Sequence, residues 1–333
     1  MSQIKRAVTF YSFQDNYVRK KMSLDDIMSY VKNELQADME FIPDQMLKGA
    51  PYSTEETLKE WDRLVAKNGI RPVCCGSYIN DKLYKNRMLT IKEGTQKLID
   101  EIKLAHRLGF PMIKLVSTTR PEIVERALPT AEKYNVVLTE EIHGGMSFNM
   151  PYVQESLKMM DRLKSPYLGF TIDTGIFCRR HPRVSTNYFK TIGLNNEYII
   201  SYIDDIFARG TDPNAYFMAH PEAQKELMDK CSNETEALYI IYATGYDNNP
   251  LQILDDYLGY VKHIHGKVYE MTEEGVEYSI PYDEVVNYLK EKNFDGYIST
   301  EYEGTRFTVF GEIPPEVDQV TKHQQLLKRL IEC

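Results

Sequence analysis

Short apolar runs alternate with longer amphipathic stretches along the chain, and this alternation constrains the fold more than any other feature. Most of the runs are rich in Val, Ile, Phe, Tyr or Leu, as buried parallel strands are. Eight strands are predicted, at residues 6–11, 38–42, 71–75, 112–116, 136–142, 168–173, 261–267 and 296–302. Eight strand–helix units favour a closed (β/α)₈ TIM barrel over an open doubly wound sheet. The first strand is not followed by a GxGxxG motif, which weakens the dinucleotide-binding alternative.

Helix start signals occupy the stretches between the predicted strands. Residues 53–56 (STEE) and 90–93 (TIKE) match the capping box, and each precedes an apolar stripe of helical spacing. Pro121 fits the first position of a further helix. The alternation is therefore one of strands with helices, as the barrel requires.

One connection is much longer than the others. Residues 180–252 separate the sixth and seventh predicted strands and contain more than one helical pattern. This segment follows the carboxyl end of a strand, where the loops of such barrels build active sites. We expect a single barrel domain over residues 1–333, with 180–252 as a lid or partner-docking insertion within it rather than an ornament.

Charge and cysteine content limit the partners and the compartment. The net charge of −9 argues against nucleic acid and anionic membranes as partners. The five cysteines are odd in number and form no CxxC pair, as is typical of reduced thiols. No apolar run has the length of a membrane helix, and the first residues lack a signal-peptide pattern. A cytoplasmic protein is expected.

Polar residues gather at the carboxyl ends of four successive predicted strands. Alternate residues of a barrel strand face inward, and burying several carboxylates there is costly unless a cation neutralises them. One divalent ion would do so, held by Glu141, Asp173, His265 and Glu301. Three oxygens and one nitrogen suit Mn²⁺ best, with Mg²⁺, Co²⁺, Fe²⁺ or Zn²⁺ as alternatives.

Further residues near these strand ends are candidates for catalysis and substrate binding. His143 lies two residues past Glu141 at the expected rim, where a histidine can transfer protons near neutral pH. Lys267 is a candidate to steady an oxyanion or a ligand carboxylate, and Cys178 and Arg179 are candidates to touch substrate.

Other polar residues are interpreted as structural. His263 lies one layer deeper than His265 and is expected to support the ligands or the core. Glu140 has the opposite parity and is expected to face outward in a salt bridge. The remaining histidines divide into helical surface residues (His106 and His323) and residues of the insertion that could line a cleft (His181 and His220).

Several of these segments resemble the xylose-isomerase-like barrel family of sugar isomerases, epimerases and dehydratases. They are EIHGG at 141–145, Asp173, HIHGK at 263–267 and GYISTE at 296–301. The resemblance spans nearly the whole chain. It implies a divalent metal, commonly Mn²⁺, and carries the ligand role onto Glu141, Asp173, His265 and Glu301.

A closer resemblance is to the catalytic (alpha) subunits of bacterial C-glycoside deglycosidases. It rests on AVTFYSFQD at 7–15, FIPDQ at 41–45 and EIH at 141–143. It implies a lyase that cleaves the C–C bond of 3-oxo-C-glucosides with flavonoid-type aglycones, by enediolate formation and elimination. It also implies a hetero-oligomer with a small beta subunit. Catalysis would use Glu141 and Glu301, as in the two-base epimerases, with His143 as a third proton carrier.

The motifs leave other reactions open. A metal-dependent isomerase or epimerase of keto-sugars, or an inosose-type dehydratase, shares the first proton abstraction. An endonuclease-type hydrolase of the same barrel would need more strand-end histidines and a less acidic surface. A non-catalytic sugar-binding barrel would not need an intact ligand set.

Overall fold

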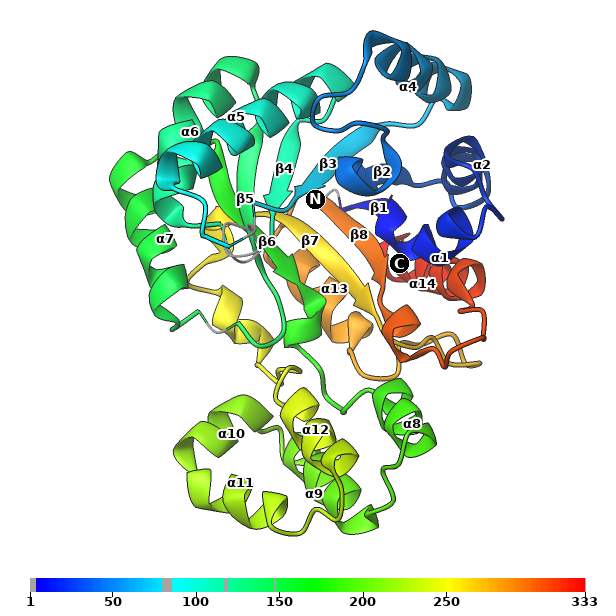
Figure 1. Ribbon diagram of the computed structural model, residues 1–333, viewed down its shortest axis with the longest axis vertical. Coiled ribbons are helices and arrows are strands. Elements are labelled where there is room, and N and C mark those ends of the chain that lie inside the picture. Colours follow the sequence, from blue (N-terminus) through cyan, green and yellow to red (C-terminus); the bar gives the residue numbers. More distant parts are fainter. Residues whose placement is uncertain (1–3, 80–85, 117–118, 147, 333) are drawn as a thin grey trace.

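The computed structural model of the protein describes residues 4–79, 86–116, 119–146 and 148–332. Its parallel strands close into one barrel in the order β1-β2-β3-β4-β5-β6-β7-β8, which confirms the predicted TIM barrel (Figure 1). The strands are β1 (Lys5–Thr9), β2 (Asp38–Phe41), β3 (Pro72–Ser77), β4 (Met112–Leu115), β5 (Val137–Ile142), β6 (Leu168–Asp173), β7 (Val261–Val268) and β8 (Tyr297–Tyr302). Each lies within two residues of its predicted position.

Helices surround the barrel and extend from one of its ends. They are α1 (Gln14–Val18), α2 (Leu24–Ser29), α3 (Pro43–Met46), α4 (Glu55–Asn68), α5 (Ile91–Leu108), α6 (Pro121–Tyr134), α7 (Pro151–Leu163), α8 (Arg183–Thr191), α9 (Glu197–Ala208), α10 (Pro213–Ala219), α11 (Pro221–Met228), α12 (Glu234–Ala243), α13 (Tyr282–Glu291) and α14 (Glu316–Glu332). Short turns include η1 (Phe10–Phe13), η3 (Thr174–Ile176) and η6 (Gly304–Phe307). Within the part of the chain described above, no helix combines the length and apolar character needed to cross a membrane.

The predicted helix starts are largely confirmed. Thr90 caps α5 through a complete capping box with Glu93, and Pro121 is the first residue of α6. At α4 the N-cap is Thr54, whose side chain accepts a hydrogen bond from the Thr57 amide. The capping box expected at 53–56 is therefore wrong: the cap lies one residue later and has Thr57 in place of the acidic N3 partner.

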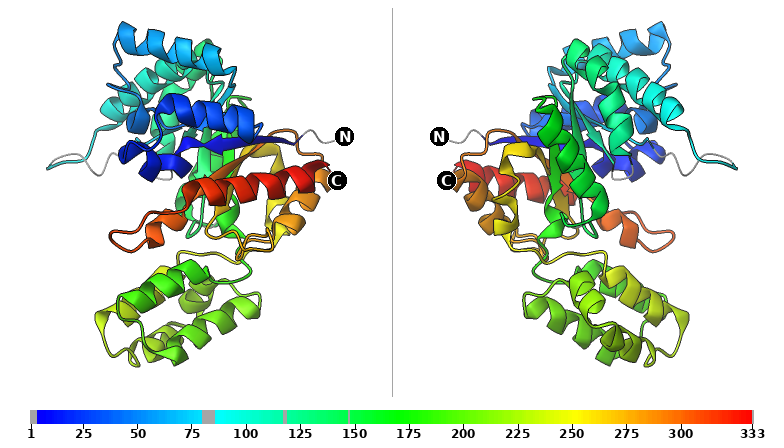
Figure 2. Two further views of the ribbon diagram at one scale, coloured as in Figure 1. Left: turned by 90° about the vertical axis from the view of Figure 1, so that its right-hand side faces the viewer. Right: turned by 90° about the vertical axis from the view of Figure 1, so that its left-hand side faces the viewer.

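The segment 180–252 forms its own layer of helices, α8 to α12, beyond the carboxyl ends of the strands (Figures 1 and 2). Backbone hydrogen bonds tie its base to the barrel, from the Cys178 amide to the Asp247 carbonyl at 2.9 Å and from the Arg179 amide to the Ser279 carbonyl at 2.7 Å. The Gly145 amide, past the end of β5, donates to the Asp247 carboxylate at 2.9 Å. The insertion thus lies directly over the end of the barrel where site residues were expected.

Two histidines differ from expectation. His323 on α14 is fully buried rather than on the surface, and its Nδ1 lies 2.8 Å from the Thr300 hydroxyl. His181, at the start of the insertion, does not line a cleft. Its ring packs against Phe207, Tyr239 and Tyr246, and its Nε2 has no hydrogen-bond partner. Both rings belong to the core, because other parts of the chain pack over the helix and the loop that carry them. A helical pattern in the sequence does not show this packing.

The burial of His181 predicts that the stability of the protein falls in acid. Burial lowers the pKa of His181 to about 3, so the folded state resists its protonation. The contribution to stability is complete above the unfolded pKa of about 6.5 and is lost as the pH falls toward 3. This residue alone should lower the free energy of unfolding by about 4 kcal/mol across that window.

Urea unfolding of metal-free protein at a series of pH values tests this expectation. The variant His181→Gln keeps a group that can bond Thr186 but does not titrate, so its stability should depend less steeply on pH. Equal slopes for the variant and the unchanged protein would show that His181 is not buried as a neutral ring.

Candidate metal centre

The carboxyl ends of four neighbouring strands bring the predicted ligands together. Glu141 is the second-last residue of β5, and Asp173 is the last residue of β6. His265 lies in β7 and Glu301 lies in β8. One ligand atom from each of the four lies within 4.8 Å of all the others, and all four side chains are buried. The alternation of a barrel strand explains this placement, since each of these residues has the inward parity of its strand.

Two buried lysines form ion pairs with the cluster. Lys114, from β4, lies 3.0 Å from Glu141. Lys267, from β7, lies 2.9 Å from Asp173 and is also paired with Glu301. The predicted role of Lys267 beside a ligand carboxylate agrees with this position, whereas the sequence reasoning missed Lys114. Its signal was a lone lysine inside an otherwise apolar strand.

These pairs decide the protonation of the cluster. Burial pushes the pKa of Glu141 upward, but Lys114 and His265 outweigh it and lower that pKa to about 2. Burial also opposes the charge on Glu301, yet His265 and Lys267 hold its pKa well below the ordinary value. Asp173 differs, because burial dominates and raises its pKa despite Lys267. Glu141 and Glu301 are therefore anionic, as metal ligands must be.

The residues present fit a divalent cation. Carboxylates outnumber cationic groups in this buried region, which contains Glu40, Glu141, Asp173, Glu301 and Glu303 against Lys114, Lys267 and His265. An excess of buried negative charge is costly unless a cation offsets it. The convergent donors are three carboxylates and one imidazole, a set that hard and borderline divalent ions accept.

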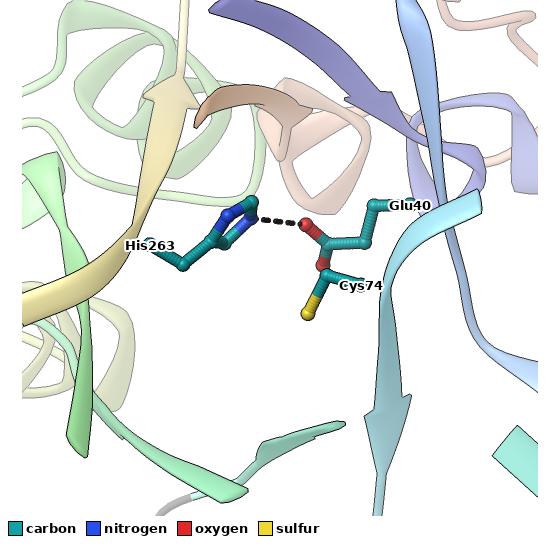
Figure 3. A group of neighbouring side chains, drawn as sticks. All are labelled: Glu40, Cys74 and His263. Atoms are coloured by element: carbon teal, nitrogen blue, oxygen red, sulfur yellow. Dashed lines mark hydrogen bonds and ion pairs between the residues drawn. The ribbon is translucent and has the colours of Figure 1, made fainter. Parts of the chain in front are cut away.

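Glu40 is the second residue that sequence reasoning missed. It lies in β2, yet its carboxylate reaches across the barrel to two histidines of β7, 2.9 Å from His263 Nε2 and 2.7 Å from His265 Nε2. Figure 3 shows the Glu40 carboxylate and the His263 ring facing each other, with the sulfur of Cys74 to one side. His263 thus lies one layer deeper than His265, as expected, and contacts Glu40. The only sequence signal for Glu40 was a carboxylate between two apolar residues, Met39 and Phe41.

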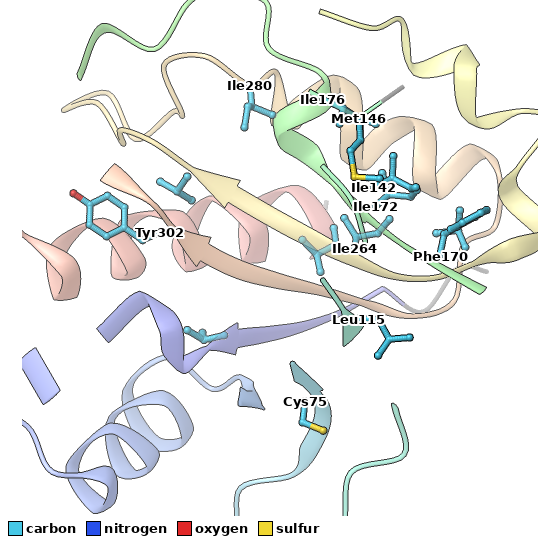
Figure 4. Close-up of a cluster of buried hydrophobic side chains, with 14 of the residues drawn as sticks. Cys75, Leu115, Ile142, Met146, Phe170, Ile172, Ile176, Ile264, Ile280 and Tyr302 are labelled. Carbon is cyan, nitrogen blue, oxygen red and sulfur yellow. The ribbon is translucent and has the colours of Figure 1, made fainter. Parts of the chain in front are cut away.

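Residues that alternate with the site residues face outward and build the layer between strands and helices. Leu115, Ile142, Ile172 and Ile264 are buried there (Figure 4). Glu140 has this outward parity, as expected, but the salt bridge predicted for it is wrong. Its side chain is buried, and none of the ion pairs among the described residues includes it. Burial raises its pKa to about 7.

A cavity of about 970 Å³ opens above the cluster. Its floor includes Glu141, Asp173, Lys267 and Glu301, and His143 lines its side. His143 Nδ1 lies 2.7 Å from the Gly144 carbonyl oxygen. A carbonyl only accepts, so Nδ1 carries a hydrogen in this contact. The structure thus places His143 beside the predicted ligands and outside their cluster.

The outer wall of this cavity is apolar and comes largely from the insertion. It includes Tyr188 and Phe189 of α8, Leu238, Ile241 and Tyr242 of α12, and Phe307 of η6. Tyr242 remains 54% exposed and Ile241 51% exposed, so α12 presents an apolar face to the mouth of the cavity. A ligand can therefore meet charge at its inner end and apolar surface at its outer end.

Two predicted substrate contacts lie elsewhere. Cys178 is fully buried, and its thiol donates to the Gly175 carbonyl at 3.3 Å. Arg179 binds the side-chain oxygen of Asn248 at 2.9 Å and lies 3.4 Å from Glu284. Neither lines the cavity. Both follow β6 in sequence, but η3 turns the chain away from the barrel axis before they are reached.

The barrel resembles a solved structure of the same fold, that of a sugar phosphate isomerase/epimerase from Parabacteroides distasonis. The TM-score is 0.56 at 12% identity, with 98% of this chain and 94% of that chain covered. No family model matches the chain.

Two relatives resemble the chain in sequence over nearly their whole length. The 3'-dehydrocarminate deglycosidase alpha subunit of a Microbacterium species is 26% identical over 97% of this chain and 94% of its own length. The C-glycoside deglycosidase alpha subunit of Arthrobacter globiformis is 27% identical over 99% of this chain and 93% of its own length. The chain is homologous to these alpha subunits over nearly its whole length, which confirms the resemblance found in its motifs.

Proposed function

We propose that the protein is the catalytic subunit of a C-glycoside deglycosidase. Its reaction would be the cleavage of the C–C bond between a 3-oxo-glucose and a flavonoid-type aglycone. The observation that carries the proposal is the two-part cavity, with a buried charged floor and an apolar outer wall. Support comes from the full-length relatives, which are named deglycosidase alpha subunits.

The proposed cofactor is one divalent ion, Mn²⁺ by the preference of the donor set, with Mg²⁺, Co²⁺, Fe²⁺ or Zn²⁺ as alternatives. Glu141, Asp173, His265 and Glu301 would hold it. When bound, it supplies a Lewis acid that makes a hydrogen next to a ketone more acidic.

The side chains of the cavity account for the proton transfers. The carboxylate of Glu141 or Glu301 removes the C2 hydrogen of the sugar as a proton, which gives an enediolate. The electron pair then forms the C1–C2 double bond, and the bond from C1 to the aglycone breaks with its pair on the aglycone carbon. His143, protonated at Nε2 before this step, delivers that proton to the aglycone carbon and is left as the neutral ring. Lys267 places its ammonium beside the negative charge that develops on the sugar.

The apolar wall accounts for the aglycone. A flavonoid-type ring system is flat and apolar, and aromatic side chains provide large complementary surface at little entropic cost. Tyr188, Tyr242 and Phe307 lie on that side of the cavity, opposite the floor that would hold the sugar. The sugar is thereby oriented with its C1 substituent toward the insertion.

A partner subunit is part of the proposal. Both relatives are named alpha subunits, and the mouth of the cavity carries exposed apolar side chains, Ile192, Leu238, Ile241 and Tyr242. Exposed apolar patches of this kind mark interaction sites. The insertion 180–252 would serve as lid and docking element for a small beta subunit. The proposed location is the cytoplasm, in keeping with the free thiols of the described cysteines.

The test is product analysis of the chain with and without its partner. Co-expression with the product of a neighbouring small open reading frame should give a stable complex that releases free aglycone from a 3-oxo-C-glucoside, followed by mass spectrometry. The isolated chain should release much less, because water at an open site returns the enediolate to the starting sugar. A complex that leaves every 3-oxo-C-glucoside intact contradicts the proposal.

A keto-sugar isomerase or epimerase is the second candidate. The observation in its favour is the pair of anionic carboxylates, Glu141 and Glu301, in one cluster, which can serve opposite faces of a sugar. It predicts that the isolated chain interconverts free keto-sugars and leaves C-glycosides untouched. The same product analysis therefore separates the two candidates.

A further inference from the structure

The Glu40 carboxylate lies directly behind the candidate metal centre. It is fully buried in β2 and lies 2.7 Å from Nε2 of His265. The other ring nitrogen of His265, Nδ1, lies 2.9 Å from Glu141 and 3.1 Å from Glu301. The two faces of this imidazole are thus divided, with Nε2 toward Glu40 and Nδ1 toward the cluster.

We propose that Glu40 is a positioning residue for the metal centre, which holds His265 Nε2–H so that Nδ1 is presented to the ion. The inference rests on the metal centre of the proposed function. A ligand histidine that donates its other N–H to a carboxylate has a fixed tautomer, a fixed ring orientation and a more basic ligand nitrogen. Here the carboxylate comes from β2, which is separated from β7 around the barrel by β8 and β1.

His263 completes the arrangement. Its Nε2 lies 2.9 Å from the second oxygen of Glu40, so both carboxylate oxygens have an imidazole partner. His263 and His265 are two residues apart on one strand. They therefore hold the Glu40 carboxylate from two successive layers of the barrel interior. Lys114, 3.9 Å from Glu40, adds a positive charge that helps to offset the burial of this carboxylate.

The same residues permit a rival interpretation, a second metal site made of Glu40, Cys74 and His263. Their ligand atoms lie within 4.8 Å of one another. Two observations disfavour it. Both oxygens of Glu40 are engaged by histidines, and burial raises the pKa of the Cys74 thiol well above its ordinary value, which disfavours the thiolate that a metal ligand needs. The interpretations differ in the number of ions bound and in the role of Cys74.

The experiment measures Mn²⁺ binding to metal-free protein in the absence of substrate, by electron paramagnetic resonance of the free ion. The unchanged protein should bind one ion per chain. Glu40→Gln keeps the shape of the side chain and removes its charge, and should weaken Mn²⁺ binding about 10- to 100-fold. The visible absorption of bound Co²⁺ should also shift in this variant, because His265 is a less basic ligand; a merely structural role would leave that spectrum unchanged.

Cys74→Ala is the matched control, because Cys74 adjoins Glu40 in the register of β2 and β3 but makes no contact with the four ligands in the proposed arrangement. It should bind one ion with unchanged affinity and an unchanged Co²⁺ spectrum. If Glu40→Gln does not fold, Glu40→Asp replaces it, since the shorter carboxylate falls short of His265 and should also weaken binding.

Two outcomes would overturn the inference. One is Mn²⁺ binding by the Glu40 variant at the affinity of the unchanged protein. The other is two ions per chain, falling to one in Cys74→Ala, which would establish the second metal site instead. Neither outcome tests the deglycosidase reaction. Conversely, a protein that shows the expected Mn²⁺ results but releases no aglycone would retain the role of Glu40 and refute the deglycosidase.

Discussion

Asp173→Asn should weaken Mn²⁺ binding by at least about 100-fold and abolish turnover at ordinary metal concentrations. The change removes one anionic donor from the cluster while it preserves the size of the side chain. The local fold should survive, because the amide oxygen can still accept the 2.7 Å hydrogen bond from the Gly175 amide. Equilibrium dialysis with Mn²⁺ measures the loss directly.

Glu140→Gln is the matched control for Asp173→Asn. Glu140 is also a buried carboxylate at the end of a strand, but it faces the helices rather than the cavity. It should bind Mn²⁺ as the unchanged protein does. Chelation should likewise abolish turnover of the unchanged protein, and added Mn²⁺ should restore it. Full turnover by metal-free protein would refute the metal centre.

His143→Ala should lower turnover by at least about 100-fold, as the loss of a general acid–base group does. His143 lines the cavity beside the cluster but is not among the four converging ligands. Its removal should therefore leave the metal content near that of the unchanged protein. Single-turnover kinetics, with metal analysis of the same sample, separates the two effects.

His220→Ala provides the control for His143→Ala. His220 is an exposed histidine of the insertion and does not line the cavity, so its removal should change neither turnover nor metal content. The decisive contrary result is a His143 variant that loses its metal. That result would make His143 a ligand and would leave the proton transfer to the aglycone without a donor.

The predicted ligands and the residues missed beside them differ in one respect. Glu141, Asp173 and Glu301 lie within the last two residues of their strands, so position within the βα repeat identifies them as strand-end residues. Lys114 and Glu40 lie inside short strands, with apolar neighbours on both sides. There a charge has no partner nearby in the sequence. The partner of Lys114 becomes visible only when β4 is paired with β5, and the partners of Glu40 only when β2 lies across the barrel from β7.

The errors concern partners and loops rather than strands. Glu140 faces outward as its parity requires, yet α7 covers it and no cation meets it among the described residues. Arg179 follows β6 as expected, but η3 redirects the chain and its guanidinium binds Asn248 of the insertion. The helical pattern predicts a surface position for His323 on α14, but the structure buries its ring against β8. In each of these three cases, the environment of the side chain depends on which distant part of the chain packs against it.

The sequence by itself determined the barrel, the positions of its strands and the side of each strand that a residue occupies. These follow from an alternation of period two and from the order of strands and helices, which are local properties of the backbone. Only the tertiary structure decided that Glu40 reaches His265 across the barrel and that α12 faces the cavity. The physical reason is that barrel closure brings non-neighbouring strands face to face, and no local pattern records which side chains then meet.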